Sequence, residues 1–151
     1  MNFTLYSDEY FMNEALKEAR KAYDENEVPV GAVIVSNTKI IARAHNMTEQ
    51  LKDVTGHAEM LAITAAENHL GGKYLDDCTL YVCLEPCLMC GSAMNWAKLG
   101  KLVYGASDPK AGYSIWSGPV LHPKTEVLSA VLKQECGELI TRFFKEKREM
   151  P

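Results

Sequence analysis

The chain of 151 residues is 47% hydrophobic and 24% charged, with a formal net charge of −4 at neutral pH. This composition is ordinary for a soluble globular protein with a substantial core, so we expect a single domain over residues 1–151. No apolar stretch is long enough to span a bilayer, and residues 1–10 lack the basic and then apolar pattern of a signal peptide. We therefore expect a cytoplasmic protein with no membrane partner.

The first half of the chain predicts a helix, a hairpin and a second helix. Ser7 can cap an amphipathic helix whose apolar residues recur at helical spacing. Residues 28–35 form a nearly continuous apolar run, and residues 39–45 follow it after a short polar turn, which predicts an antiparallel hairpin. A polar loop follows over residues 46–56, and the next helix should end at the glycine pair that begins with Gly71.

The second half predicts a strand, a helix and a strand in close succession, then a long loop and two terminal helices. The close succession implies a right-handed parallel crossover, so the sheet should be mixed and a site should lie at strand ends. We also expect a short fifth strand, without a position, and Trp96 in the core. The expected segments are strands at 79–84 and 101–104, a helix at 88–98, a loop at 105–123, and helices at 126–134 and 138–147 broken near Gly137.

Cysteine usage separates one pair from the rest. Cys87 and Cys90 have the Cys-x-x-Cys spacing of metal ligands, whereas Cys78, Cys83 and Cys136 are scattered along the chain. An odd cysteine count without a secretory pattern argues against a disulfide framework. We expect the three scattered cysteines to be reduced and buried as small apolar residues.

Two short motifs bring together the residue types that bind zinc. His57 is followed two residues later by Glu59, and Pro86 directly precedes the Cys87 and Cys90 pair. Three protein ligands with an open fourth position describe a catalytic zinc site, because a structural site normally fills all four positions with side chains. Glu59 is then a free carboxylate placed to move protons. We expect one Zn2+ per chain and no organic cofactor.

The spacing within the motifs predicts where their helices begin. Residues i and i+2 of a helix point about 200° apart, so His57 and Glu59 can share a site only at a helix entrance. We expect His57 near the cap and Glu59 in the first turn. Pro86 suits the first position of the next helix, which would place Cys87 in the first turn, where the helix dipole favours a thiolate.

Together the motifs form the H-x-E…P-C-x-x-C signature of zinc deaminases that act on nucleobases. Along nearly its whole length the chain resembles the bacterial tRNA-specific adenosine deaminases of the cytidine deaminase superfamily. The resemblance rests on residues 27–35, 45–46, 57–60, 84–90, 103–106, 108, 110 and 112, and on the pair Phe143-Phe144.

The resemblance implies a fold, a substrate and a set of site residues. The fold would be an α/β three-layer α/β/α sandwich around a mixed sheet of about five strands. The protein would be a homodimer that holds a tRNA anticodon stem-loop with both subunits and hydrolyses the wobble adenosine to inosine. The implied site residues are the zinc ligands His57, Cys87 and Cys90, the proton shuttle Glu59, and the substrate-binding residues Asn46, Asp108 and Lys110.

Some positions depart from the family pattern. Val54, Gly56, the pair that begins with Gly91, and Ser107 differ from the residues that are common there, and residues 113–117 replace a run of small residues. None is an implied ligand or the glutamate, so the zinc chemistry is retained. Those departures that lie in loops fall where the family contacts RNA, which leaves other substrates open.

Two other functions fit the same ligand pattern. One is deamination of a free nucleobase or nucleotide, such as guanine or cytosine. The other is a zinc-stabilised RNA-binding module without turnover, in which Glu59 would have no role. The basic and aromatic tail, residues 142–148, is either a local nucleic-acid contact or a solvated helix whose phenylalanines pack on the core.

Overall fold

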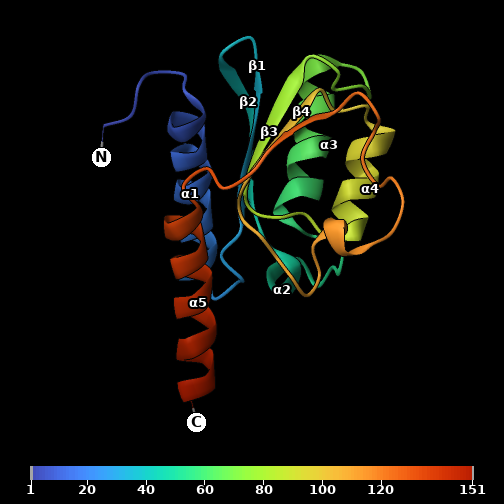
Figure 1. Cartoon of the computed structure of the whole chain (residues 1–151). Helices are drawn as coiled ribbons and strands as arrows, with labels where there is room; N and C mark the ends of the chain where they lie inside the picture. Colours follow the sequence, from blue (N-terminus) through green and yellow to red (C-terminus); the bar gives the residue numbers. More distant parts are fainter. Residues whose placement is uncertain (1, 151) are drawn as a thin grey trace.

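The computed structural model describes residues 2–150 and shows helices on both faces of a five-stranded sheet (Figure 1). The helices are α1 (Asp8–Asp24), α2 (Thr48–Leu51), α3 (Ala58–Leu70), α4 (Leu88–Trp96) and α5 (Lys133–Glu149), with a 3-10 turn η1 (Tyr113–Ile115). The strands are β1 (Gly31–Ser36), β2 (Lys39–His45), β3 (Cys78–Leu84), β4 (Lys101–Ala106) and β5 (Glu126–Leu128). Their order in the sheet is β2-β1-β3-β4-β5.

The sheet is mixed and forms the middle of three layers. β1 pairs antiparallel with β2 and β3, whereas β4 pairs parallel with β3 and β5. Helices α1 and α5 cover one face, and α3 and α4 cover the other (Figure 1). The expected mixed, five-stranded α/β/α arrangement is therefore confirmed. No helix within residues 2–150 is long and apolar enough to cross a membrane.

Alternate residues of the strands enter two separate cores. In β1, Ala32 and Ile34 pack in the core under α3 and α4, while Val33 and Val35 pack in the core under α1. Burial on both faces explains why the strand sequence is a continuous apolar run rather than an alternating one. The two cores hold the strands in register, because a slip of one residue would exchange the two faces.

Most boundaries in the first half agree with the prediction. The Ser7 hydroxyl caps α1 by accepting a hydrogen bond from the backbone N–H of Tyr10 at 3.1 Å. Gly71 ends α3 in the left-handed conformation. The first hairpin strand begins at Gly31 rather than at residue 28, because Pro29 has no N–H to donate to the ladder. The predicted loop 46–56 contains the short helix α2.

The C-terminal region corrects the prediction. Residues 126–134, expected as a helix, contain strand β5, and α5 runs without a break through Gly137. β5 has only three residues, all exposed, so neither alternation nor burial marks it in the sequence. A Cβ at Gly137 would lie 3.8 Å from the Cβ of Ala106 in β4. Packing of α5 on the sheet therefore outweighs the low helix propensity of glycine.

We expect Gly137→Ala to raise the free energy of unfolding by about 0.5–1 kcal/mol, because alanine favours the helix and its methyl group meets only ordinary van der Waals contact. Urea denaturation with an unchanged m-value measures this. Gly71→Ala is the matched control and should destabilise, since φ at Gly71 is +71°. A destabilising Gly137→Ala change would indicate that the chain breaks its helix near residue 137 after all.

Candidate metal centre

The amino termini of α3 and α4 meet at the lower end of the sheet in Figure 1, and each carries a candidate ligand at its cap. His57 is the N-cap of α3, with Glu59 in the first turn, as the spacing predicted. Cys87 is the N-cap of α4, so the prediction that Pro86 begins this helix was wrong. Cys87 has extended backbone and forms a β-bridge with Gly112, which keeps it out of the helix.

Three donor atoms converge between these two helix ends. His57 Nδ1 lies 3.6 Å from Cys87 Sγ and 3.5 Å from Cys90 Sγ, and all three atoms lie within 4.8 Å of one another. A tetrahedral zinc ion with ordinary bond lengths separates an imidazole nitrogen from a thiolate sulfur by about 3.6 Å. The donor set therefore fits zinc in the observed arrangement and supplies three of four positions.

The pKa values of the Cys87 and Cys90 thiols are shifted in opposite directions. A hydrogen bond from Cys90 lowers the pKa of Cys87 to about 4, and His57 also favours the Cys87 thiolate. The same hydrogen bond, together with burial, raises the pKa of Cys90 well above its usual range. The bond to Cys87 also raises the pKa of His57. The donors thus hold protons that a cation would displace, because metal ligands bind in their deprotonated forms.

Glu59 reaches the same place from the first turn of α3. The residue is 4% exposed, and this burial raises the pKa of Glu59 to about 6. Glu59 lines the same cavity as His57 and Cys87, and both of these groups influence its pKa, so the carboxylate lies beside the donor atoms. An exposed glutamate has a pKa of about 4.3, so Glu59 is better suited to accept and return a proton near neutral pH.

A cavity of about 260 Å³ opens onto these groups. Its walls are largely apolar and include Val28, Val30, Leu84 and Ala111. A few polar side chains, Glu59 among them, face the same space. An apolar cavity with a few placed polar groups is the usual form of a small-molecule site, and a volume just below the usual range suits one planar ring system.

Asn46 is held at the polar side of the cavity. The residue is 7% exposed, its Nδ2 donates to the backbone carbonyl of Val28 at 3.3 Å, and its Oδ1 accepts from the backbone N–H of Thr48 at 3.3 Å. A primary amide has two donors and two acceptor lone pairs. One donor and one lone pair therefore remain for a ligand.

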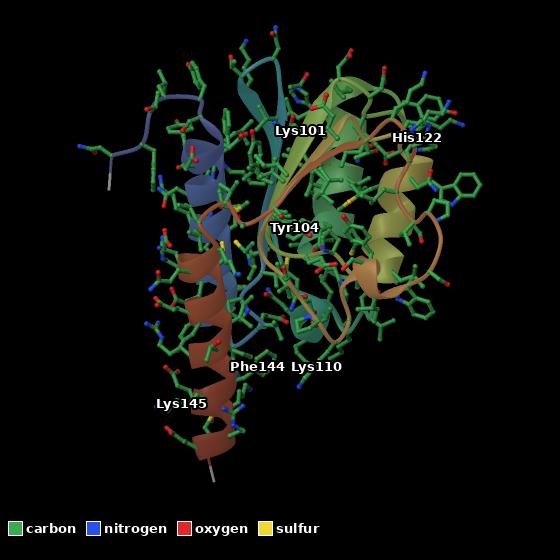
Figure 2. All side chains as sticks on the ribbon, viewed as in Figure 1. Lys101, Tyr104, Lys110, His122, Phe144 and Lys145 are labelled. Carbon is green, nitrogen blue, oxygen red and sulfur yellow. The ribbon has the colours of Figure 1, made fainter. Side chains whose placement is uncertain are left out.

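The structure separates Asp108 from Lys110. Asp108 lines the cavity, and its Oδ1 accepts the backbone N–H groups of Lys110 and Ala111 at 3.1 Å each. Lys110 is exposed at the lower end of the body of the molecule, although α5 extends further down (Figure 2). Of the residues that the sequence singled out, the cavity gathers Asn46, His57, Glu59, Cys87 and Asp108, with Cys90 beside Cys87, and leaves Lys110 outside.

Two buried glutamates hold the walls of this cavity, and the sequence analysis missed both. Glu27 is 1% exposed, and its carboxylate accepts two backbone N–H groups of α2 at 3.1 and 2.8 Å. Glu85 is 4% exposed, and its carboxylate accepts two backbone N–H groups from residues 108–114. No pattern marks such residues, because a glutamate in a loop normally faces solvent and the partner amides are distant in sequence.

The C-terminal tail borders a second groove beside the cavity. Phe143 is buried against Tyr23, as the packing alternative predicted, whereas Phe144 is 42% exposed (Figure 2). A groove of about 600 Å³ joins Phe144 and Lys147 to α2, and Val28 lines both this groove and the cavity. The tail therefore packs on the body through one phenylalanine and leaves the other at the groove.

Comparisons with known proteins agree with this geometry. Residues 5–106 match the family model of the cytidine and deoxycytidylate deaminase zinc-binding region. The chain is 46% identical to the tRNA-specific adenosine deaminase of Bacillus subtilis over 147 residues, which cover 94% of this chain and 91% of that protein.

Solved structures are similar as well. One comes from studies of A-to-I editing by tRNA:A34 deaminases at the wobble position of transfer RNA. It matches with a TM-score of 0.81 and 43% identity over 86% of this chain and 98% of that chain. A guanine deaminase from Bacillus subtilis matches with a TM-score of 0.63 and 38% identity over 71% of this chain and 66% of that chain.

We expect Glu27→Gln to lower the free energy of unfolding by about 1–3 kcal/mol, because an amide can accept only one of the two N–H groups and turns its own donors towards the other. The midpoint of urea denaturation at an unchanged m-value measures this. Glu49→Gln, an exposed change on the same short helix, is the control and should shift stability by less than about 0.5 kcal/mol. Equal, small effects of both variants would show that Glu27 does not fasten α2.

Proposed function

The chain belongs to the cytidine and deoxycytidylate deaminase zinc-binding family, among the bacterial tRNA-specific adenosine deaminases, and we propose that it hydrolyses adenosine to inosine at the wobble position of a tRNA anticodon. One observation carries the proposal. Within residues 2–150, a free buried carboxylate, Glu59, faces a cavity at which three protein donors meet. A structural zinc site needs four side-chain ligands, and an RNA-binding module without turnover would give Glu59 no role.

The reaction follows from the placement of Glu59. His57, Cys87 and Cys90 would hold Zn2+, which lowers the pKa of water and so supplies a nucleophile near neutral pH. Glu59 takes a proton from the water that attacks C6 of adenine, and gives a proton to ring nitrogen N1. A further proton transfer through Glu59 lets the C6 amino group leave as ammonia. Adenosine and water become inosine and ammonia.

Asn46 and the apolar walls orient the base for this attack. The free donor and lone pair of Asn46 match the hydrogen-bonding edge of a purine. Val28, Val30 and Leu84 provide apolar contact for the ring and exclude bulk water, which strengthens the polar interactions inside the cavity. We infer that these contacts direct C6 towards Glu59.

An adenosine in an anticodon loop can enter this cavity easily, because the bases of the loop are already poorly paired. Extruding such a base costs at most a few kcal/mol, less than extruding one from a duplex. The adenosine deaminase of Bacillus subtilis, named for tRNA, matches over a larger share of both chains than the guanine deaminase does. These matches support adenosine in a tRNA anticodon stem-loop over a free base as the substrate.

Apolar residues on the outer faces of α3 and α4 support the proposal that the protein is a homodimer. Trp96, expected in the core, is 85% exposed. It lies on the same face of α4 as Met89 and Ala93, and both of these residues are only half-buried. On α3, Leu61 is half-buried and Ala65 is exposed. Helices with apolar residues outside their buried face are normally covered on that side too. We infer that a second copy of this chain covers these faces.

Cofactor content and location complete the proposal. We propose one Zn2+ per chain, held by the single convergent donor set found within the described residues. All five cysteines are free, which agrees with a reducing compartment. Together with a tRNA substrate, this supports a cytoplasmic enzyme.

The proposed activity is tested with a short anticodon stem-loop RNA that carries adenosine at the wobble position. We expect inosine to form in this RNA, while free adenosine, guanine and cytosine in parallel reactions stay unchanged. Glu59→Gln should lower the rate by about 100-fold or more, because it removes the proton carrier. Glu67→Gln, at a half-buried position later in α3, is the matched control and should keep the rate. Conversion of free guanine with the RNA untouched would contradict the substrate assignment.

Metal analysis tests the cofactor separately. Protein purified without chelator should contain about one zinc per chain, since the three donors form one site. His57→Ala should lose most of the zinc and the activity, because two thiolates alone bind the ion more weakly. Mass spectrometry of the metal content measures this. Full activity in protein without zinc would contradict the proposed mechanism.

A further inference from the structure

Glu85 is a buried carboxylate in the cavity wall that the proposed reaction does not use. Its Oε1 accepts the backbone N–H of Asp108 at 3.1 Å, and its Oε2 accepts the backbone N–H of Ser114 at 3.0 Å. The residue is 4% exposed. Both oxygens are therefore engaged by the backbone of one segment, residues 108–114.

This segment folds closely around the Glu85 carboxylate. The N–H of Gly112 donates to the carbonyl of Asp108 at 2.9 Å, and the N–H of Tyr113 donates to the carbonyl of Pro86 at 2.8 Å. A Cβ at Gly112 would lie 2.3 Å from Cδ of Glu85. Gly112 has φ −63° and ψ 149°, so glycine is needed here for the close approach and not for the backbone conformation.

The same segment forms part of the cavity and pairs with the backbone of the candidate ligand Cys87. Asp108 and Ala111 line the cavity, and Gly112 pairs with Cys87 in a β-bridge. The two hydrogen bonds to Glu85 therefore act on a segment that forms part of the cavity wall. Charge-assisted hydrogen bonds to a buried carboxylate are stronger than those between neutral groups, so they can hold a segment whose regular structure is limited to one β-bridge and the start of η1.

We propose that Glu85 is a positioning residue that fixes the wall formed by residues 108–114 and thereby sets the affinity for the base-bearing substrate. The identity of that substrate rests on the proposed function. Because both Glu85 oxygens bind the backbone of residues 108–114, we assign positioning to Glu85 and proton transfer to Glu59. Its loss should therefore weaken substrate binding more than it slows the chemical step.

Glu85→Gln tests this by replacing one acceptor with a donor at nearly unchanged volume. We expect KM for the stem-loop RNA to rise about tenfold or more, since a small displacement of a positioning wall is costly. kcat should stay within about threefold of the wild-type value, and zinc content should be unchanged. Amide hydrogen exchange at Asp108 and Ser114 should become faster while exchange in the core of the sheet does not change.

Gly112→Ala is the second variant, because it displaces the segment from the carboxylate while Glu85 is intact. It should reproduce both the KM increase and the faster exchange at Asp108 and Ser114. Gly72→Ala is the matched control, since a Cβ there meets no atom within 4 Å. If Glu85→Gln does not fold, Gly112→Ala alone decides the outcome by the same two readouts.

Two results would overturn the proposal. One is unchanged exchange at the Asp108 and Ser114 amides in the folded variants. The other is a loss of kcat in Glu85→Gln as large as that in Glu59→Gln with KM unchanged, which would assign Glu85 a chemical role. The exchange experiment needs no substrate, so it still tests the positioning role if the stem-loop RNA is not converted and the proposed function fails.

Discussion

The convergence of two helix amino termini at one end of the sheet is the constraint on which the site depends. The cap of α3 supplies His57 and the cap of α4 supplies Cys87, so their donor atoms meet only if both helices begin at the right residue. Both helix ends also present partial positive charge to the site, which favours a thiolate and an attacking anion. β3, which directly precedes α4, is buried on both faces, and its register sets where that helix starts.

Three buried glutamates surround this point, and their hydrogen-bond partners separate their roles. Glu27 accepts two backbone N–H groups of α2 and Glu85 accepts two from residues 108–114, so both carboxylates contact segments that line the cavity. Glu59 lies beside the donor atoms, and burial raises its pKa to about 6. A proton carrier at neutral pH needs a carboxylate whose charge is not stabilised by other partners. We therefore propose that Glu27 and Glu85 serve the architecture and that Glu59 serves the chemistry.

The sequence predicted those parts of the molecule whose structure is determined by residues close together in the chain. The His57 motif, the capped first helix and the apolar strands are read from neighbouring residues, and the structure places them accordingly, whereas α4 begins two residues later than Pro86 suggested. The remainder depends on contacts between distant residues. β5 is a three-residue exposed strand, and Gly137 is helical because α5 packs on β4. Glu85 can be buried because its carboxylate accepts backbone N–H groups that lie more than twenty residues away in the sequence.

Zinc K-edge X-ray absorption spectroscopy on the purified protein tests the central claim most directly, because it reads the ligand set without reference to a substrate. We predict two sulfur ligands at about 2.3 Å, one imidazole nitrogen at about 2.0 Å and one further light ligand. Cys90→Ser should lower the sulfur count by one. A coordination shell filled by four protein side chains, or one without sulfur, would contradict the assignment of a catalytic zinc site to His57, Cys87 and Cys90.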